Sequence, residues 1–222
     1  MDDVGPTELN ARETRNASPD RLLAFTDGVF AIIITILVLE IAVPDLGPDQ
    51  TLRQALNDLR PTFVAYAISF VLVGAYWMWH RNAFSQVRYI DNNVLWLNLA
   101  YLLTVALVPF AAATLGEYEQ DPIALHLYGS VLIAATLARV AVDWYLGRHP
   151  GLLWQPMSTQ ARRLSLVAAG APIAVYAIAM AVADVAPSLT LLLYVSMPLL
   201  YLILIVGLKS GRRTRIASED LS

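Results

Sequence analysis

The sequence predicts an all-α integral membrane protein with six transmembrane helices in each subunit. Of its 222 residues, 57% are hydrophobic and only 15% are charged, whereas soluble domains carry about 25% charged residues. Several apolar runs approach the length of about 20 residues that a helix needs to cross a bilayer. A third observation, the placement of Lys and Arg on alternate connections, supports the number of spans.

Six apolar segments follow one another along the chain, separated by polar connections. The spanning helices are expected at residues 21–43, 61–80, 93–114, 122–146, 163–184 and 187–208. They form one membrane domain over residues 19–209, and we expect the polar segments 1–18 and 210–222 to be disordered tails. Since the first 20 residues contain no apolar stretch, a cleavable signal peptide is not expected.

Several local signals set the ends and bends of these helices. Ser18 and Pro19 suit the N-cap and first turn of the first helix, and Pro44 stops it. Residues 52–59 alternate apolar and charged side chains like a short surface helix, so the second span can begin before Pro61. Prolines at three positions inside predicted helices are expected to kink them, namely Pro109, Pro172 and Pro198.

Lys and Arg are concentrated on the N-terminal tail, on alternate connections and on the C-terminal tail. The basic connections contain Arg81 and Arg88, then Arg148, Arg162 and Arg163. The other connections are mainly acidic. With six spans, all basic segments face one side, so the positive-inside rule predicts that both termini are cytoplasmic.

The sequence gives no support for an enzyme. It has no cysteine, and its histidines, His80, His126 and His149, do not stand at metal-ligand spacing. Phosphate-binding loops and HExxH or GxSxG motifs are also absent from it. We therefore expect no catalytic residues, no cofactor, no metal centre and no nucleic-acid partner.

One face of the first helix is apolar and contains a single hydroxyl. Ile32, Thr35, Ile36 and Leu39 fall at i, i+3, i+4 and i+7, so they share this face. Gly28 continues it one turn earlier and allows a close approach of another helix. The spacing is compatible with a pore surface, and equally with an ordinary lipid-facing or core surface.

Ionisable groups inside a membrane span are expensive and therefore candidates for function. Asp27 lies about 140° from Ile32 around the helix, so it points toward neighbouring helices, where candidate partners include Arg21, His80 and Arg81. Either a salt bridge that locks two helices or a role in gating fits this position. Further along, Arg139 and Asp143 form an i, i+4 pair that is expected to be mutually satisfied.

The first helix resembles the signature of the prokaryotic transmembrane protein 175 potassium channels, the lysosomal-type potassium channel family. Thr26 stands where the usual motif has serine, and the second helix ends in a similar pattern of Trp77, His80 and Phe84. The matching run in the first helix is Arg21-x-x-x-Phe25-Thr26-Asp27-Gly28-Val29-Phe30-Ala31-Ile32, followed by Thr35-x-x-Val38-Leu39-Glu40-Ile41.

The resemblance implies a homotetramer in which the first helix of each subunit lines a central pore. Ile32, Ile36 and Leu39 would form rings of large apolar side chains, with Ile32 the tightest, and Thr35 a ring of hydroxyls. The resemblance also implies a network that holds the first helix in place and contains Arg21, Thr26, Asp27 and His80. Glu40 would stand at the pore mouth, although it could equally be an interfacial acid.

We therefore expect a passive, potassium-preferring cation channel in a bacterial inner membrane, gated by movement of the first helix. Its partners would be three further copies of the chain, the lipid bilayer and monovalent cations, and potassium would be its cargo. A secondary or proton-coupled cation transporter is the alternative, and a structural membrane protein without flux is the third class. A carrier would need an ionisable residue at mid-membrane, where the first helix has none.

Overall fold

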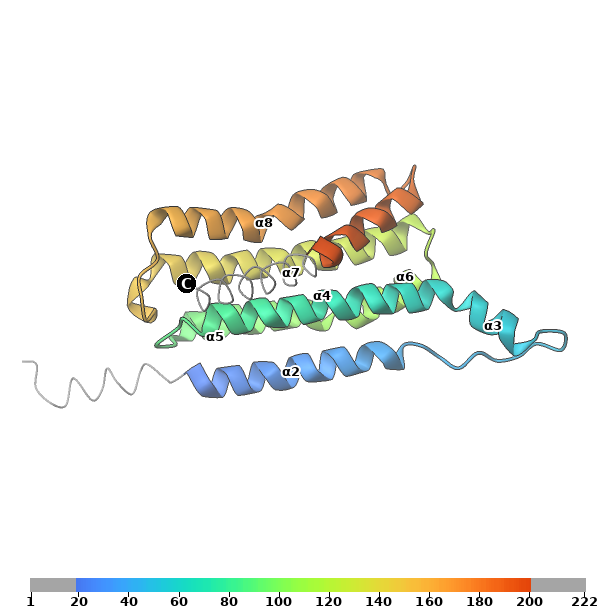
Figure 1. Cartoon of the computed structure of the whole chain (residues 1–222), viewed down its shortest axis with the longest axis horizontal. Coiled ribbons are helices and arrows are strands. Elements are labelled where there is room, and N and C mark those ends of the chain that lie inside the picture. Colours follow the sequence, from blue (N-terminus) through green and yellow to red (C-terminus); the bar gives the residue numbers. More distant parts are fainter. Residues whose placement is uncertain (1–18, 201–222) are drawn as a thin grey trace, which may run out of the picture.

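The protein is a bundle of long helices, described by a computed structural model over residues 19–200 (Figure 1). Within these residues, five segments are long and apolar enough to cross a membrane, so the prediction of an all-helical membrane protein is confirmed. They are α2 (Pro19–Leu39), α4 (Arg60–Phe84), α5 (Asn92–Ala106) continued by α6 (Val108–Glu117), α7 (Pro122–Arg148) and α8 (Thr159–Val182).

The sixth predicted span is described only in part. An apolar helix begins at Pro187 and is described as far as Leu200. The remainder of the predicted span 187–208 lies outside the described residues, as do the predicted tails 1–18 and 210–222.

The first span is shorter than the sequence suggested, because α2 ends at Leu39 and not at residue 43. Pro44 disfavours a helical conformation for the residue before it. The chain leaves the helix several residues earlier through a turn in which the Ile41 N–H donates to the Val38 carbonyl at 3.1 Å. Glu40 therefore lies just beyond the helix and not inside its last turn.

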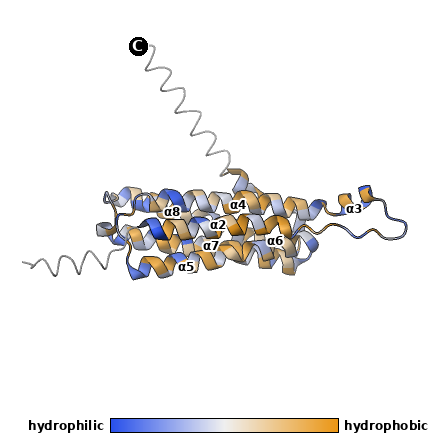
Figure 2. Ribbon diagram, turned by 90° about the horizontal axis from the view of Figure 1, so that it is seen from below, coloured by the Kyte–Doolittle hydropathy of each residue, from blue (hydrophilic) through white to orange (hydrophobic). Residues whose placement is uncertain are grey.

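The connection between α2 and α4 contains the expected short helix, α3 (Leu52–Asp58). Thr51 caps it, and the side chain of Gln54 bonds back to the Thr51 N–H at 2.9 Å, which completes a capping box. Together with the extended segment before it, α3 projects beyond the end of the bundle (Figures 1 and 2). As predicted, α4 begins before Pro61, at Arg60.

Of the prolines expected to kink helices, Pro109 has the strongest effect. The third span is divided at Leu107 into α5 and α6, because a proline lacks the backbone N–H and its ring collides with the carbonyl one turn earlier. By contrast, α8 continues as one helix across Pro172, and Pro198 lies within the described part of the sixth helix.

One apolar core joins the helices, and buried tyrosines supply much of its volume. α7 packs against α5, α6 and α8, while α4 packs against α2 and α6. Tyr128 and Tyr194 are buried, and both hydroxyls are satisfied. The Tyr128 hydroxyl lies 2.9 Å from that of Ser69, and the Tyr194 hydroxyl donates to the Leu125 carbonyl at 2.9 Å.

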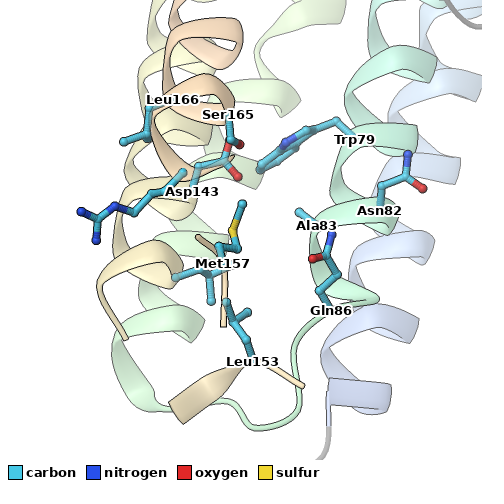
Figure 3. Close-up of a pocket in the computed structure, with 11 residues that line it drawn as sticks. Trp79, Asn82, Ala83, Gln86, Asp143, Leu153, Met157, Ser165 and Leu166 are labelled. Carbon is cyan, nitrogen blue, oxygen red and sulfur yellow. The ribbon is translucent and has the colours of Figure 1, made fainter. Parts of the chain in front are cut away.

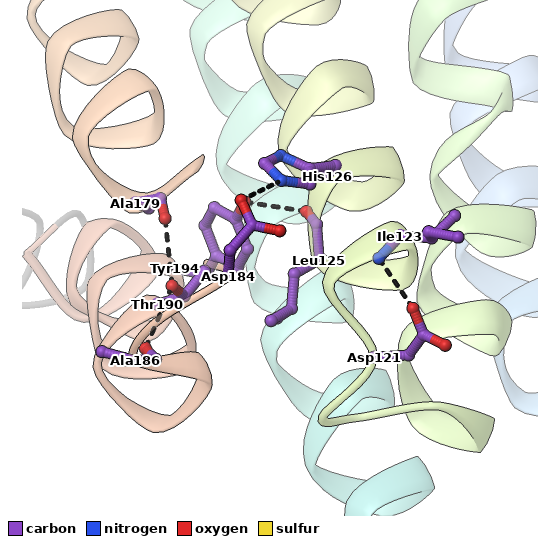
Figure 4. Close-up of polar contacts among 9 residues, drawn as sticks. All are labelled: Asp121, Ile123, Leu125, His126, Ala179, Asp184, Ala186, Thr190 and Tyr194. Atoms are coloured by element: carbon purple, nitrogen blue, oxygen red, sulfur yellow. Dashed lines mark hydrogen bonds and ion pairs between the residues drawn. The ribbon is translucent and has the colours of Figure 1, made fainter. Parts of the chain in front are cut away.

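The sixth helix is held closely against α7 and α8 (Figure 4). A Cβ atom at Gly129 of α7 would overlap the Tyr194 hydroxyl and the side chain of Met180, so the close approach at this point requires glycine. Thr190 donates to the Ala179 carbonyl at 3.0 Å. At the surface nearby, His126 Nε2 lies 3.4 Å from Asp184 Oδ2.

The antiparallel order of the helices places the basic connections at one end of the bundle. The α4–α5 and α7–α8 connections and the start of α2 lie at this end, which we call the basic end (Figure 1). The two connections are joined there by backbone hydrogen bonds from Arg88 to Leu152 (2.7 Å) and from Trp154 to Gln86 (2.9 Å). Hydrophobic residues predominate along the helices between the two ends (Figure 2).

Candidate functional site

α2 lies at the edge of the bundle and is attached to it by one narrow stripe (Figure 1). It packs mainly on α4, with further contacts to α5 and α6. The stripe repeats at helical spacing, as expected for a helix with a single packed face. Its buried residues are Leu22, Thr26, Phe30, Ile33 and Leu37.

The opposite face of α2 is the one that the sequence singled out. On the surface of the single chain, Ile32 is 59% exposed, Ile36 38% and Leu39 77%, and Thr35 is exposed as well. We call these four residues the open face of α2. A spanning helix with such a face must cover it with lipid, with another subunit or with the contents of a pore.

Thr35 uses its proton within its own helix. Its hydroxyl lies 3.0 Å from the Ala31 carbonyl and 2.9 Å from the Ile32 carbonyl, and it donates toward both. A threonine hydroxyl has one proton and two lone pairs. Because the proton points back to the helix, the oxygen lone pairs are available on the open face, where they can accept a hydrogen bond or contact a cation.

A groove runs beside the open face at the point where the third span is interrupted. Its volume is about 320 Å³, and it is lined on the α2 side by Ile32, Ile36 and Glu40. Pro109 and Phe110, next to the break at Leu107, line the other side. Glu40 therefore lies where the open face ends, on the side of the bundle opposite to the basic end.

Behind the open face, Thr26 is joined to α5 and α4 by a buried polar network. Asn98 of α5 donates to the Thr26 hydroxyl at 3.0 Å, and its carbonyl oxygen lies 2.8 Å from His80 Nε2. All three side chains are buried. Since the Asn98 amide nitrogen donates to Thr26, its oxygen must accept the His80 bond, so Nε2 carries the imidazole proton.

The His80 ring is enclosed by aromatic side chains. It stacks on Phe84 with a centroid separation of 4.1 Å, and Phe30 and Tyr101 lie at 6.2 Å. Its second nitrogen, Nδ1, is buried without a hydrogen-bond partner among the described residues. These contacts fix the orientation of the ring, so Asn98 is held at the position where it reaches Thr26.

Asp27 is held separately, by an aromatic side chain of α4. The indole N–H of Trp77 donates to Asp27 Oδ1 at 2.8 Å, and the Arg81 guanidinium lies 5.8 Å from the centre of the Trp77 ring. Arg21 is exposed, and no ion pair joins it to Asp27 within residues 19–200. Of the predicted network, the structure thus connects Thr26 with His80 and attaches Asp27 to α4 independently.

Asn98 was not identified from the sequence, and Trp77 was identified only as part of the pattern that ends the second helix, without a role in the network. Trp77 has the character of a residue at the membrane interface, and its donation to Asp27 depends on contact between α2 and α4. Asn98 could have been noticed in the sequence, because an amide inside a spanning helix requires a polar partner. Its bond to Thr26 joins residues 72 positions apart in the chain.

Replacing Asn98 with alanine should destabilise the subunit by about 2–4 kcal/mol, because it leaves two buried groups, on Thr26 and His80, without their partner. The measurement is thermal unfolding of the purified protein in detergent. Asn93→Ala on the same helix is the control, since Asn93 is exposed and its one bond, to the Tyr145 hydroxyl, is at the surface. Equal effects of the two changes would show that the network does not hold α2.

The comparisons with known proteins show the family to which the chain belongs. A family model described as the endosomal/lysosomal potassium channel TMEM175 matches residues 21–109. A potassium channel of Streptomyces collinus is 41% identical over 140 residues, which cover 61% of this chain and 68% of that channel. The chain belongs to the TMEM175 family. The matched residues include α2, α4 and α5, and with them the open face and the network behind it.

A solved TMEM175 structure supports the fold over most of the chain. The crystal structure of a lysosomal potassium-selective channel TMEM175 homolog from Chamaesiphon minutus superposes with a TM-score of 0.74 at 26% identity. The match covers 83% of this chain and 96% of that one. The mouse endosomal/lysosomal proton channel TMEM175 is 28% identical over 69% of this chain, but the match spans only 31% of the mouse protein.

Within this TMEM175 chain, Asp27→Asn should reduce the yield and thermal stability of the assembled protein more than its ion preference. The change keeps an acceptor for Trp77 but removes the charge that strengthens the hydrogen bond. The loss should lower the free energy of unfolding by about 1 kcal/mol. Trp77→Phe and the double variant complete a cycle, in which the two losses should not add. A variant of unchanged yield and thermal stability with altered ion preference would contradict this assignment.

Proposed function

We propose that the protein is a passive, potassium-preferring cation channel whose pore is lined by α2 of four subunits. Two kinds of relative support this proposal. The Streptomyces protein is named a potassium channel, and the Chamaesiphon structure is titled a potassium-selective channel. On this proposal the protein is not an enzyme, and potassium is its cargo.

The observation that carries the proposal is the open face of α2. The helix is apolar enough to span a membrane, yet its two most exposed large hydrophobic side chains, Ile32 and Leu39, lie away from the stripe that attaches it to the bundle. Around a fourfold axis, this face gives apolar rings at Ile32, Ile36 and Leu39. Between the first two, the hydroxyls of Thr35 give a polar ring.

The physical behaviour of such a pore follows from its lining. A narrow apolar ring loses its water and then excludes an ion that still needs hydration, whereas a slightly wider ring admits a partly hydrated ion. The hydroxyls of Thr35 replace part of the hydration shell. Potassium is less strongly hydrated than sodium, so partial dehydration at the apolar rings costs it less free energy. Moderate selectivity for potassium results.

At the far end of the open face, the position of Glu40 fits a pore mouth. It follows the last residue of α2 and borders the groove shared with Ile36. Four carboxylates around an axis would raise the local concentration of cations at the entrance. We place this mouth outside the cell and both termini in the cytoplasm of a bacterial inner membrane, because the basic connections gather at the opposite end.

The alternative, a secondary or proton-coupled transporter, is less well supported by α2. Vertebrate relatives are named proton channels, so proton flux should be measured beside potassium flux. However, residues 28–38 of α2 contain no ionisable side chain, and a carrier coupled to protons needs one near the middle of the membrane. A passive path for potassium needs no ionisable residue, because the apolar rings and the hydroxyl ring of α2 are sufficient for it.

The test is ion flux through the purified full-length protein in liposomes. With a potassium gradient and no proton gradient, we expect potassium to move down its own gradient without saturating in the manner of a carrier. Sodium should move more slowly. Flux that saturates and stops when a proton gradient is collapsed would favour the transporter, and vesicles without flux would favour a structural role.

A further inference from the structure

A cavity of about 200 Å³ opens at the basic end, between α4, α7 and α8 (Figure 3), and no residue of α2 lines it. Its volume is well above the roughly 10–15 Å³ needed to hold one water. Leu153 and Met157, from the connection between α7 and α8, form part of its wall. That connection is fixed by its backbone bonds to the α4–α5 connection, so the cavity belongs to the folded bundle.

An acidic side chain faces this cavity without a complete set of partners. Asp143 of α7 lines it, and its Oδ2 is buried with no hydrogen-bond donor among the described residues. Its carboxylate interacts with the side chain of Trp79 and with the charge of the i, i+4 neighbour Arg139, whose guanidinium lies 4.8 Å from the centre of the Trp79 ring. A buried carboxylate oxygen without a donor is costly, so the cavity presents an unused acceptor for a cationic donor.

A basic side chain lines the same cavity from another helix. Arg162 of α8 uses one nitrogen to donate to the Gly147 carbonyl at 3.2 Å, and a guanidinium has five N–H groups in all. Ser165, one turn further along α8, adds a hydroxyl. Asn82 of α4 and Gln86, just beyond the end of α4, also border the space. The cavity is therefore lined by hydrogen-bond donors on α8 and by a carboxylate acceptor on α7.

The remaining walls and the position of the cavity are those of a membrane interface. Leu153, Met157 and Leu166 make part of the lining apolar. The cavity lies where α4 ends at Phe84 and α8 begins at Thr159, which is the level of lipid headgroups for helices that span the apolar core. A ligand with both charges and an apolar tail satisfies all of these features.

We propose that this cavity binds the headgroup of a phospholipid that carries a primary ammonium, as phosphatidylethanolamine does. The ammonium donates to Asp143 Oδ2, and the phosphate accepts hydrogen bonds from Arg162 and Ser165. A quaternary ammonium has no N–H and cannot make the first of these bonds, so the site distinguishes phosphatidylethanolamine from phosphatidylcholine. The proposal goes beyond ion conduction and does not depend on it.

Native mass spectrometry of the full-length protein, equilibrated with equal amounts of phosphatidylethanolamine, phosphatidylcholine and phosphatidylglycerol, tests this proposal. We expect phosphatidylethanolamine to be retained at least about tenfold more than phosphatidylcholine, with retention falling through the N-methyl and N,N-dimethyl lipids. Asp143→Asn should abolish the preference, and Arg162→Gln should weaken binding of both lipids. Arg163→Gln is the matched control and should change neither, because Arg163 is exposed and does not line the cavity.

Four results would overturn the proposal. Equal retention of the ethanolamine and choline lipids by the unmodified protein would do so without any variant, even if Asp143→Asn failed to fold. Preferential retention of phosphatidylglycerol, or equal effects of Arg162→Gln and Arg163→Gln, would reduce the site to general attraction by basic residues. Displacement of the lipid by soluble glycerophosphoethanolamine at the same concentration would assign the site to a free headgroup instead of a lipid.

Discussion

Replacing Ile32 with alanine is expected to raise potassium flux by at least about tenfold and to leave the channel leaky. The side chain is large and exposed on the open face, and in the proposed tetramer four copies form the tightest apolar ring. Removing three carbons from each widens the ring and allows it to hold water. A tenfold gain requires the barrier to fall by only about 1.4 kcal/mol. The measurement is single-channel recording in planar bilayers.

The neighbouring residue provides a matched control. Ile33 has the same side chain but is buried against the bundle. Ile33→Ala should therefore lower the free energy of unfolding by about 2–5 kcal/mol through loss of core packing. It should not raise the conductance of the channels that do assemble. If Ile32→Ala conducts like the unmodified channel, or if both changes have the same effect, α2 does not present its open face to the ion path.

Replacing Thr35 with alanine should reduce the preference for potassium over sodium, while conduction continues. The hydroxyl proton is already directed to the Ala31 and Ile32 carbonyls, so the oxygen lone pairs are what the change removes from the open face. A ring without oxygens is entirely apolar, and it no longer replaces any part of the hydration shell. Reversal potentials under bi-ionic conditions measure the change.

Thr35→Ser separates the hydroxyl from the volume of the side chain. It keeps the oxygen and removes only a methyl group, so it should retain most of the selectivity that Thr35→Ala loses. A serine variant that behaves like the alanine variant would assign the effect to packing. Unchanged reversal potentials in both variants would remove Thr35 from the ion path.

The sequence was most informative about the helices and least informative about what joins them. Long apolar runs predicted five spans that the structure describes, since a helix in lipid must satisfy its own backbone. Pro109 correctly marked an interruption, while Pro172 did not break α8. The early end of α2 at Leu39 was missed, because proline excludes a helical residue before it but does not fix how much earlier the chain turns away.

For the site, periodicity could predict which α2 residues share a face, but not which face attaches to the bundle. The polar partners were harder still. Thr26, Asp27 and His80 were identified from a family signature, yet the bonds run through Asn98 and Trp77. Such bonds depend on the axial offset and the rotation of each helix relative to its neighbour. Both are determined by the packing of the whole bundle.

The two halves of α2 are fastened by different kinds of contact, and this has a mechanical consequence. Near the basic end, directional hydrogen bonds through Thr26 and Asp27 fix both the depth and the rotation of the helix. Beyond Phe30, the helix is held by aliphatic side chains, among them Ile33, Ile34 and Leu37, whose contacts are not directional. A tilt of α2 about the fixed region near Thr26 would therefore displace Leu39 further than Ile32.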